Sequence, residues 1–237
     1  MNIALLTAAG VGSRMHQDIP KQFIHINNKP VILYTLEAFQ KSPLIDEIIV
    51  VTLPNWKDMI LAYAKQYEIT KLKYIVDGGK SGQESIRCGL NELKKDHDLH
   101  DVVMIHDGNR PMISQEIIAD SFAVYQKYGS AVAAIPCTEA IFESEDGRSS
   151  EISIPREKLL RTQTPHTYML IDLLQAHEEA EKRHIYNTAA SCVLMQSLGK
   201  IIYFSKGSEK NLKLTTTEDI ETFEAYLNTQ NRMTYLK

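Results

Sequence analysis

The chain has 237 residues, 43% hydrophobic and 24% charged, which fits one large α/β domain or two small ones with a packed core. Its net charge of −4 argues against nucleic acid as the main partner. Cys88, Cys137 and Cys192 are far apart and form no CxxC motif, so neither a disulfide framework nor a zinc site is expected. With no signal peptide and no apolar stretch near the ~18 residues of a membrane span, we expect a cytoplasmic protein that does not enter a membrane.

The first apolar run, residues 3–6, predicts a buried strand that leads into a loop of small residues and cations. Glycines let the backbone bend tightly and approach a ligand closely, and Pro20 fixes the loop just before Lys21. Together with Arg14 and Lys21, the exposed amides of such a loop suit a polyphosphate. The pattern alone fits a purely structural turn equally well, because it matches neither a P-loop nor a dinucleotide fingerprint. The small residues of this loop are Ala8, Ala9, Gly10 and Gly12.

Strand-like and helix-like patterns then alternate along the chain. This alternation predicts βαβ units and a mainly parallel sheet, whose ligands lie beyond the carboxyl ends of the strands. The glycine-containing loop, the turn at 77–79 and the pair of His106 and Asp107 all follow predicted strands, which favours one shared ligand site. Buried strands are predicted at 48–51, 73–76, 102–105 and 131–135, and helices at 30–39, 56–67, 83–95 and 117–128.

The segment 136–155 interrupts this alternation. Apolar residues on both sides of an Asp-Gly turn, Ile141 and Phe142 before it and Ile152 and Ile154 after it, predict a β-hairpin. A lone hairpin has little core of its own, so we expect it to pack on a partner subunit; packing on its own domain is the alternative. Helical patterns resume at 169–182 and 188–197, followed by a strand at 201–204 and a helix at 216–227.

Two charged residues outside the loop have candidate roles. Asp107 follows a buried strand, where a carboxylate is well placed to hold Mg²⁺ together with substrate phosphates; capping a turn is the alternative. The neighbouring His106 is interpreted as a packed histidine or as one that supports a site residue, rather than as a ligand or base, because no second histidine lies at metal-ligand spacing. Lys213 alternates with Leu212 and Leu214 as on a short strand, and is either a solvated edge charge or a cation aimed into the site.

Five motifs occur in order across nearly the whole chain. They are AAGVGSRM with IPKQF at 8–23, DGG…ES at 77–85, HDGNRP at 106–111, TQTP at 162–165 and NLKLTTTED at 211–219. With these motifs the chain resembles the cytidylyltransferases that act on 2-C-methyl-D-erythritol 4-phosphate and ribitol 5-phosphate. The resemblance implies an α/β, Rossmann-like nucleotidyltransferase fold with a mainly parallel mixed sheet, helices on both faces and an inserted β-hairpin arm. It also implies a single domain over residues 1–237 and a homodimer that exchanges the arms at 136–155.

The resemblance implies a role for each matching residue. The cations that hold and activate the phosphates of CTP would be Arg14, Lys21 and Lys213. Contacts to cytosine and ribose would come from Ser85 and from the backbone around Ala8, Ala9, Gly10, Gly12 and Gly79. The metal and acceptor positions would be Asp107 for Mg²⁺ and Arg110, Arg156 and Thr164 for the acceptor.

The acceptor half departs from the family pattern. Gly82 replaces an arginine, Glu139 and Ala140 replace an Asp-Thr pair at the base of the arm, and the segment 187–191 lacks the family's carboxylates. We therefore expect a CTP-dependent and Mg²⁺-dependent cytidylyltransferase that acts on a small polyol phosphate, with an acceptor preference of its own. A CTP-binding regulatory protein without turnover and a dinucleotide-dependent oxidoreductase are the alternatives.

Overall fold

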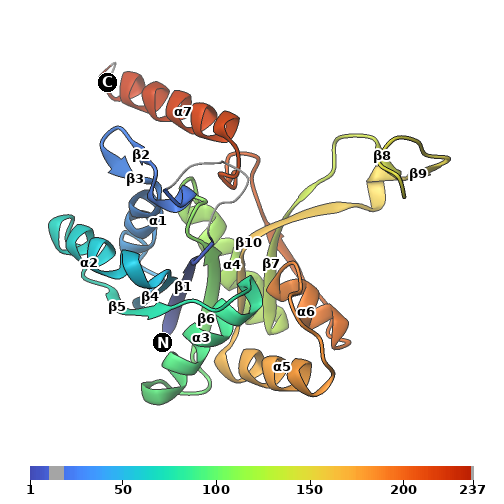
Figure 1. Ribbon diagram of the computed structural model, residues 1–237, viewed down its shortest axis with the longest axis horizontal. Helices are drawn as coiled ribbons and strands as arrows, with labels where there is room; N and C mark the ends of the chain where they lie inside the picture. Colours follow the sequence, from blue (N-terminus) through green and yellow to red (C-terminus); the bar gives the residue numbers. More distant parts are fainter. Residues whose placement is uncertain (11–18, 236–237) are drawn as a thin grey trace.

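A seven-stranded sheet forms the centre of the computed structural model, which describes residues 1–10 and 19–235 (Figure 1). The strand order is β11-β7-β10-β6-β1-β4-β5. Strand β10 runs antiparallel to both of its neighbours, while the other neighbouring strands run parallel, so the predicted mainly parallel mixed sheet is confirmed. The strands are β1 (Asn2–Ala8), β4 (Glu47–Thr52), β5 (Leu72–Asp77), β6 (Val102–Asp107), β7 (Ser130–Pro136), β10 (Leu160–Met169) and β11 (Phe204–Lys206).

Helices cover both faces of this sheet, as predicted. Strand β1 shows why, because its side chains from Ile3 to Leu6 are fully buried and successive ones point to opposite faces. Ala4 and Leu6 join the hydrophobic core beneath α1, α2 and α4, whereas Ile3 and Leu5 join the core beneath α3, α5 and α6. The helices are α1 (Val31–Gln40), α2 (Lys57–Gln66), α3 (Gly82–Asp96), α4 (Gln115–Tyr128), α5 (Leu170–Lys182), α6 (Ser191–Ser197) and α7 (Thr217–Tyr235).

Helix α7, the last helix of the chain, packs against α1. Phe223 of α7 meets Tyr34 of α1 edge-on, with 5.1 Å between the ring centroids. Within the described residues, no helix combines the length and apolar character needed to cross a bilayer. The short elements are β2 (His25–Ile26), β3 (Lys29–Pro30), β8 (Ile141–Glu143), β9 (Ile152–Ile154), η2 (Lys21–Phe23), η3 (Pro54–Trp56) and η4 (Arg156–Lys158).

The predicted hairpin is present and extends away from the sheet (Figure 1). Its strands β8 and β9 pair antiparallel with Ile141 opposite Ile154, and Gly147 has a φ of 67° in the turn between them. Phe142 and Ile152 are 59% and 57% exposed in the single chain. Exposed apolar side chains on a projecting arm favour contact with a second subunit, which stays a prediction.

Strand β10 is the main element that the sequence pattern does not reveal. Its middle contains Thr162, Thr164 and Pro165, and proline cannot donate a ladder hydrogen bond. The pairing with β7 shifts register between Thr162 and His166, so the polar segment bulges out of the regular ladder. This bulge places the TQTP motif beside the end of β6 rather than in a regular strand.

Two boundaries predicted near the end of the chain are wrong. The strand predicted at 201–204 is Phe204–Lys206 instead, which pairs with β7, and Ile201 outside it is 70% exposed. Helix α6 begins at Ser191 rather than at residue 188, because 187–190 form a loop in which Asn187 has a φ of 57°. Thr188, Ala189 and Ala190 of this loop line a pocket at the end of the sheet.

Candidate active site

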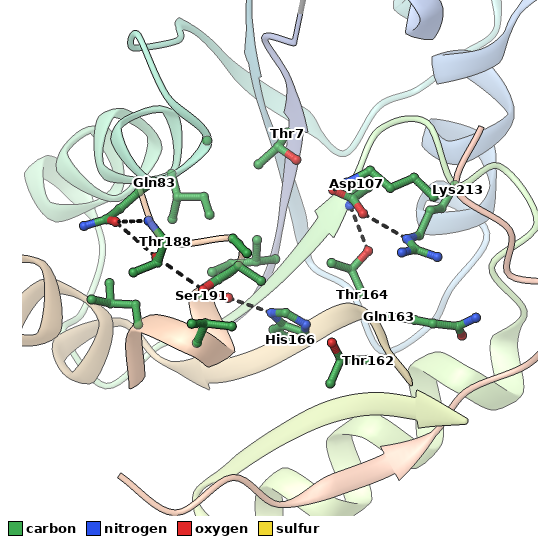
Figure 2. A pocket seen from close by; sticks show the side chains of 18 of the residues that line it. Thr7, Gln83, Asp107, Thr162, Gln163, Thr164, His166, Thr188, Ser191 and Lys213 are labelled. Atoms are coloured by element: carbon green, nitrogen blue, oxygen red, sulfur yellow. Dashed lines mark hydrogen bonds and ion pairs between the residues drawn. The ribbon is translucent and has the colours of Figure 1, made fainter. Parts of the chain in front are cut away.

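A cleft made of two pockets lies beyond the carboxyl ends of β1, β5 and β6, where the sequence predicts a ligand site. One pocket, which we name the loop pocket, is lined by Ala8, Ala9 and Gly10 at and after the end of β1 and has a volume of about 410 Å³. The other, the β10 pocket, is lined by Thr162, Gln163, Thr164 and His166 of β10 and has a volume of about 320 Å³. Thr7, Gly82, Asp107 and Lys213 line both pockets, so the two pockets meet at these residues. Figure 2 shows the β10 pocket, with Asp107 and Lys213 at one end and Gln83 and Thr188 at the other.

Gln22 shapes the first wall of the loop pocket. Its side chain is almost fully buried, and Nε2 donates hydrogen bonds to the carbonyl oxygens of Ala8, at 2.6 Å, and Gly10, at 3.0 Å. These bonds tie the loop after β1 to the short helix η2, in which Lys21 directly precedes Gln22. The contact explains why Lys21 and the Ala8–Gly10 backbone line the same pocket.

The second wall of the loop pocket is the turn after β5. Ser85 is buried, and its Oγ accepts a hydrogen bond from Gly79 N at 3.1 Å and donates one to Ser81 O at 2.8 Å. A Cβ atom on Gly78 would lie 2.3 Å from the Cβ atom of Ala9. Only glycine therefore allows the two loops to approach this closely.

Asp107 holds two cations where the pockets meet. Its Oδ1 lies 3.0 Å from Lys213 Nζ, and its Oδ2 lies 2.9 Å from Arg110 Nε. Burial raises the pKa of Asp107, but Lys213 and Arg110 together lower it by more, so the pKa lies well below its usual range. The carboxylate is therefore ionised at neutral pH and keeps both cations facing the cleft.

His106 is buried beneath the cleft and contacts Asp107 through Thr164 rather than facing the cleft itself. It is fully buried, and burial lowers its pKa to about 3, so the imidazole is neutral. Its Nε2 lies 3.2 Å from Arg110 O, which can only accept, so Nε2 carries the proton. Nδ1 then accepts from Thr164 Oγ1 at 3.1 Å, and that oxygen in turn accepts from Asp107 N at 3.0 Å. The interpretation of His106 as a packed histidine agrees with these contacts.

The segment that carries Lys213 is irregular, not the short strand that the alternation predicts. Asn211 is fully buried, and its side-chain Nδ2 donates a hydrogen bond to Thr164 O at 2.8 Å. Its backbone carbonyl oxygen accepts a hydrogen bond from Arg110 Nη1 at 2.7 Å. Asn109 and Leu214 exchange two further hydrogen bonds, of 2.5 Å and 2.9 Å. These contacts decide between the two predicted environments of Lys213, because they place it in the cleft rather than on a solvated edge.

Most of the predicted site residues are brought together. In the loop pocket these are Ala8, Ala9, Gly10, Lys21, Gly79, Ser85, Asp107 and Lys213, and in the β10 pocket Arg110 and Thr164 join the last two. Gly12 and Arg14 lie outside the described residues. Arg156 lies in η4 at the base of the arm, lines neither pocket of its own chain, and donates from Nη1 to Thr138 O at 2.7 Å.

Several lining or supporting residues are not evident from sequence patterns. They share an amide or imidazole side chain that bridges distant segments, and they are Gln22, Gln83, Asn109, Gln163, His166 and Asn211. Four of them, Gln22, Asn109, Gln163 and Asn211, stand inside the motifs quoted above, which was the available signal. Gln83 lies in the gap between the two parts of DGG…ES, and His166 directly follows TQTP.

The donor set of the cleft limits the kind of metal it can hold. No group of three or more His, Cys, Asp or Glu side chains in the described part of the chain could bind a metal ion by itself. Asp107 is the one carboxylate among the described residues that line the two pockets. A single carboxylate fits Mg²⁺ that is held mainly by substrate phosphates and water.

Comparison with known proteins agrees with the motifs. Residues 2–229 match the family described as 2-C-methyl-D-erythritol 4-phosphate cytidylyltransferase (IspD). The chain is 39% identical over 229 residues to a ribitol-5-phosphate cytidylyltransferase of Lacticaseibacillus paracasei, covering 96% of this chain and 98% of that protein. It is also 39% identical over 229 residues to a 2-C-methyl-D-erythritol 4-phosphate cytidylyltransferase of Clostridium acetobutylicum, covering 96% and 97%.

A solved structure shows the same architecture. The crystal structure of 4-diphosphocytidyl-2C-methyl-D-erythritol synthase from Anaerococcus prevotii superposes with a TM-score of 0.81 at 25% identity, covering 96% of each chain. The Rossmann-like nucleotidyltransferase fold is thus confirmed. The chain belongs to the 2-C-methyl-D-erythritol 4-phosphate cytidylyltransferase (IspD) family.

Proposed function

We propose that this chain transfers CMP from CTP to a linear four- or five-carbon polyol phosphate, with ribitol 5-phosphate as the first acceptor to test. Its family and its relatives are cytidylyltransferases, which are nucleotidyltransferase enzymes. The observation that carries the proposal is that two pockets share the ion pair of Asp107 and Lys213. A nucleotide on one side and a phosphorylated acceptor on the other would meet at this pair.

The reaction needs no protein nucleophile. An oxygen of the acceptor phosphate attacks the α-phosphorus of CTP in line, a new P–O bond forms, and the bond to the β-phosphate breaks to release pyrophosphate. Both reactants are anions, so positioning and charge neutralisation dominate the barrier. Lys21 would act on the nucleotide from the loop pocket, while Lys213 and Arg110 act where the two phosphates meet.

Mg²⁺ is part of the proposal. Asp107 would hold the ion together with phosphates of CTP, and the ion would neutralise charge on the departing pyrophosphate. Because Asp107 is ionised and already orients Lys213 and Arg110, it fixes the positive groups around the reacting phosphates before substrates arrive.

A polyol suits the composition of the β10 pocket. Hydroxyl and amide groups line it beside the apolar side chains of Ile86, Ile105, Val193 and Leu194, and among its described lining residues Asp107 is the one acidic side chain. Neutral groups that both donate and accept hydrogen bonds match a chain of hydroxyl groups, while the cations at the junction match the phosphate. The polar groups away from the junction are Thr162, Gln163, His166, Gln83, Thr188 and Ser191.

The arm supports a homodimer in which each subunit completes the other's cleft. Arg156 lies outside the cleft of its own chain, and the exposed apolar residues Phe142 and Ile152 on the same arm need a covering surface. In the proposed dimer the arm of one subunit brings Arg156 to the acceptor phosphate in the other. The altered residues Glu139 and Ala140 stand at the base of this arm.

Pyrophosphate release with CTP, Mg²⁺ and a panel of acceptors tests the proposal. The panel contains ribitol, methylerythritol, arabinitol, glycerol and mannitol phosphates. CTP should raise the melting temperature more than ATP or GTP, and ribitol 5-phosphate should be turned over. CTP binding without turnover of any acceptor would favour the regulatory alternative. Binding of NADH in a fluorescence titration would favour the oxidoreductase instead.

A further inference from the structure

Residues 185–191, which we name the acceptor wall, contribute one side of the β10 pocket through their second half. Thr188, Ala189, Ala190 and Ser191 line the pocket from this wall. Before α6 begins at Ser191, the wall has no helix or strand, so its shape depends on contacts from other elements. In Figure 2, Gln83 and His166 reach it from different elements and at different points along its length.

Gln83 holds the first half of the acceptor wall with its whole amide group. Its Oε1 accepts hydrogen bonds from Thr188 N at 2.9 Å and from Thr188 Oγ1 at 3.0 Å. Its Nε2 donates to Ile185 O at 3.0 Å. One side chain thus fixes two points of a segment that lies more than a hundred residues further along the chain.

His166 holds the far end of the acceptor wall. Its Nδ1 lies 2.7 Å from Ser191 Oγ, and both side chains are buried. Burial lowers the pKa of His166 to about 4, so this contact joins two neutral groups at neutral pH. The wall is therefore anchored to β10 through the contact of Ser191 with His166, and to α3 through the contact of Thr188 with Gln83.

The hydrogen bonds of Gln83 also set which way the Thr188 hydroxyl faces. Thr188 Oγ1 has two acceptors for its one proton, Gln83 Oε1 at 3.0 Å and Ala190 O at 3.4 Å, and the shorter contact is the one to Gln83. Because the proton is used within the protein, the hydroxyl presents oxygen lone pairs to other partners. An acceptor hydroxyl that donates a hydrogen bond would match this arrangement. An acceptor that lacks a hydroxyl at that position would leave Thr188 without a ligand partner.

We propose that Gln83 is a positioning residue that sets the choice of acceptor polyol by fixing the acceptor wall. It stands in the first turn of α3, between Gly82 and Ser85, which line the loop pocket. It does not itself line the loop pocket, so it connects the nucleotide side of the cleft to the acceptor side without a place in the nucleotide site. This inference rests on the proposed function, because it requires that the β10 pocket binds the polyol.

Gln83→Ala tests the inference through separate Michaelis constants for the two substrates. The KM for ribitol 5-phosphate should rise roughly 10-fold or more, while the KM for CTP changes by no more than about twofold. Gln40→Ala is the matched control. Gln40 likewise accepts from a backbone N–H, that of Lys71, and donates to the Thr70 hydroxyl, but it lines neither pocket.

A double-mutant cycle shows whether Gln83 acts through Thr188. Thr188→Val alone should also raise the acceptor KM, Thr188→Ser should restore most of the loss, and Gln83→Ala with Thr188→Val should cost much less than the product of the two single effects. Fully multiplicative effects, or an unchanged acceptor KM in Gln83→Ala while the wild type turns over ribitol 5-phosphate, would overturn the inference alone. A wild type that turns over no polyol phosphate would overturn the proposed function, and the inference with it.

Discussion

The Nζ atom of Lys213 lies 3.0 Å from Oδ1 of Asp107, at the place where the loop pocket and the β10 pocket meet. The two residues are 106 positions apart in the sequence, and the buried Asn211 and Asn109 hold the segment of Lys213 against the end of β6. The other carboxylate oxygen of Asp107 orients Arg110. One carboxylate therefore aligns two cations with the proposed path of the transferred phosphoryl group.

Lys213→Ala should lower kcat by roughly 10²–10³, the scale for removing one preorganised electrostatic donor. The expected loss is large because Lys213 lines both pockets and would face the charge that develops between the substrates. Steady-state kinetics at saturating CTP and acceptor measure it. Lys95→Ala, which removes an exposed lysine on α3, is the control and should leave kcat unchanged. A near-normal kcat in Lys213→Ala would show that the role is misassigned.

Lys21→Ala should cost a similar factor in kcat, roughly 10²–10³, with a different pattern in the Michaelis constants. Lys21 lines the loop pocket and not the β10 pocket. The KM for CTP should therefore rise while the KM for the acceptor stays close to that of the wild type. An acceptor KM that rises as much as the CTP KM would place Lys21 on the wrong side of the cleft.

The free energy of unfolding should fall as the pH drops from about 6.5 toward 4, because buried histidines remain neutral in the folded chain. Burial lowers the pKa of His177 and of His166 to about 4, and that of His106 to about 3. The unfolded chain takes up protons below its ordinary histidine pKa, which the folded chain resists, so acid favours unfolding. Each such residue adds up to about 1.4 kcal/mol per pH unit.

Denaturant unfolding of His177→Leu at pH 7.5 and pH 5 checks this expectation. His177 is almost fully buried on α5, and its Nε2 has no hydrogen-bond partner, so the variant removes a titrating group without breaking a contact of that nitrogen. The variant should lose less stability between the two pH values than the wild type. The exposed His100→Gln serves as the control, and an equal pH dependence in all three proteins would contradict the assignment.

The arm should hold two subunits together. Light scattering at micromolar concentration should give twice the chain mass of 26.9 kDa, and Phe142→Asp with Ile152→Asp should give the single-chain mass. Turnover should fall together with assembly, since Arg156 would no longer reach a partner's cleft. Leu61→Asp is the matched control, because Leu61 is 59% exposed on α2 and lies away from the arm. A wild type that is monomeric would refute the exchanged-arm proposal.

The sequence was informative wherever local patterns decide the structure. Strand β1 is recognisable because its apolar run, residues 3–6, is buried on both faces, and the Asp-Gly turn marks the hairpin. The sequence pattern does not predict strand β10, because its threonines and Pro165 suit a bulge beside the site rather than a regular ladder. Local propensity there is overridden by long-range pairing with β6 and β7.

The candidate site follows the same division. Lys21 and Asp107 were predicted because each directly follows a strand or loop with a recognisable pattern. The alternation around Lys213 predicted a strand where the chain is irregular, and did not say whether the Lys213 side chain points into the cleft. The side-chain contacts of Asn109 and Asn211 determine that direction. Gln83 carries no local signal, because its function depends on a partner segment more than a hundred residues away.

The most direct test of the central claim is ³¹P NMR of the wild-type protein incubated with CTP, ribitol 5-phosphate and Mg²⁺. Pyrophosphate and a CDP-linked polyol should appear in equal amounts, and their formation should stop when the metal is chelated and resume when Mg²⁺ is restored. Stoichiometric product would show that the chain transfers CMP from CTP to the polyol phosphate, the reaction assigned to the two pockets joined at Asp107 and Lys213. Bound CTP with no CDP-linked product from ribitol 5-phosphate or any other acceptor of the panel would contradict the account.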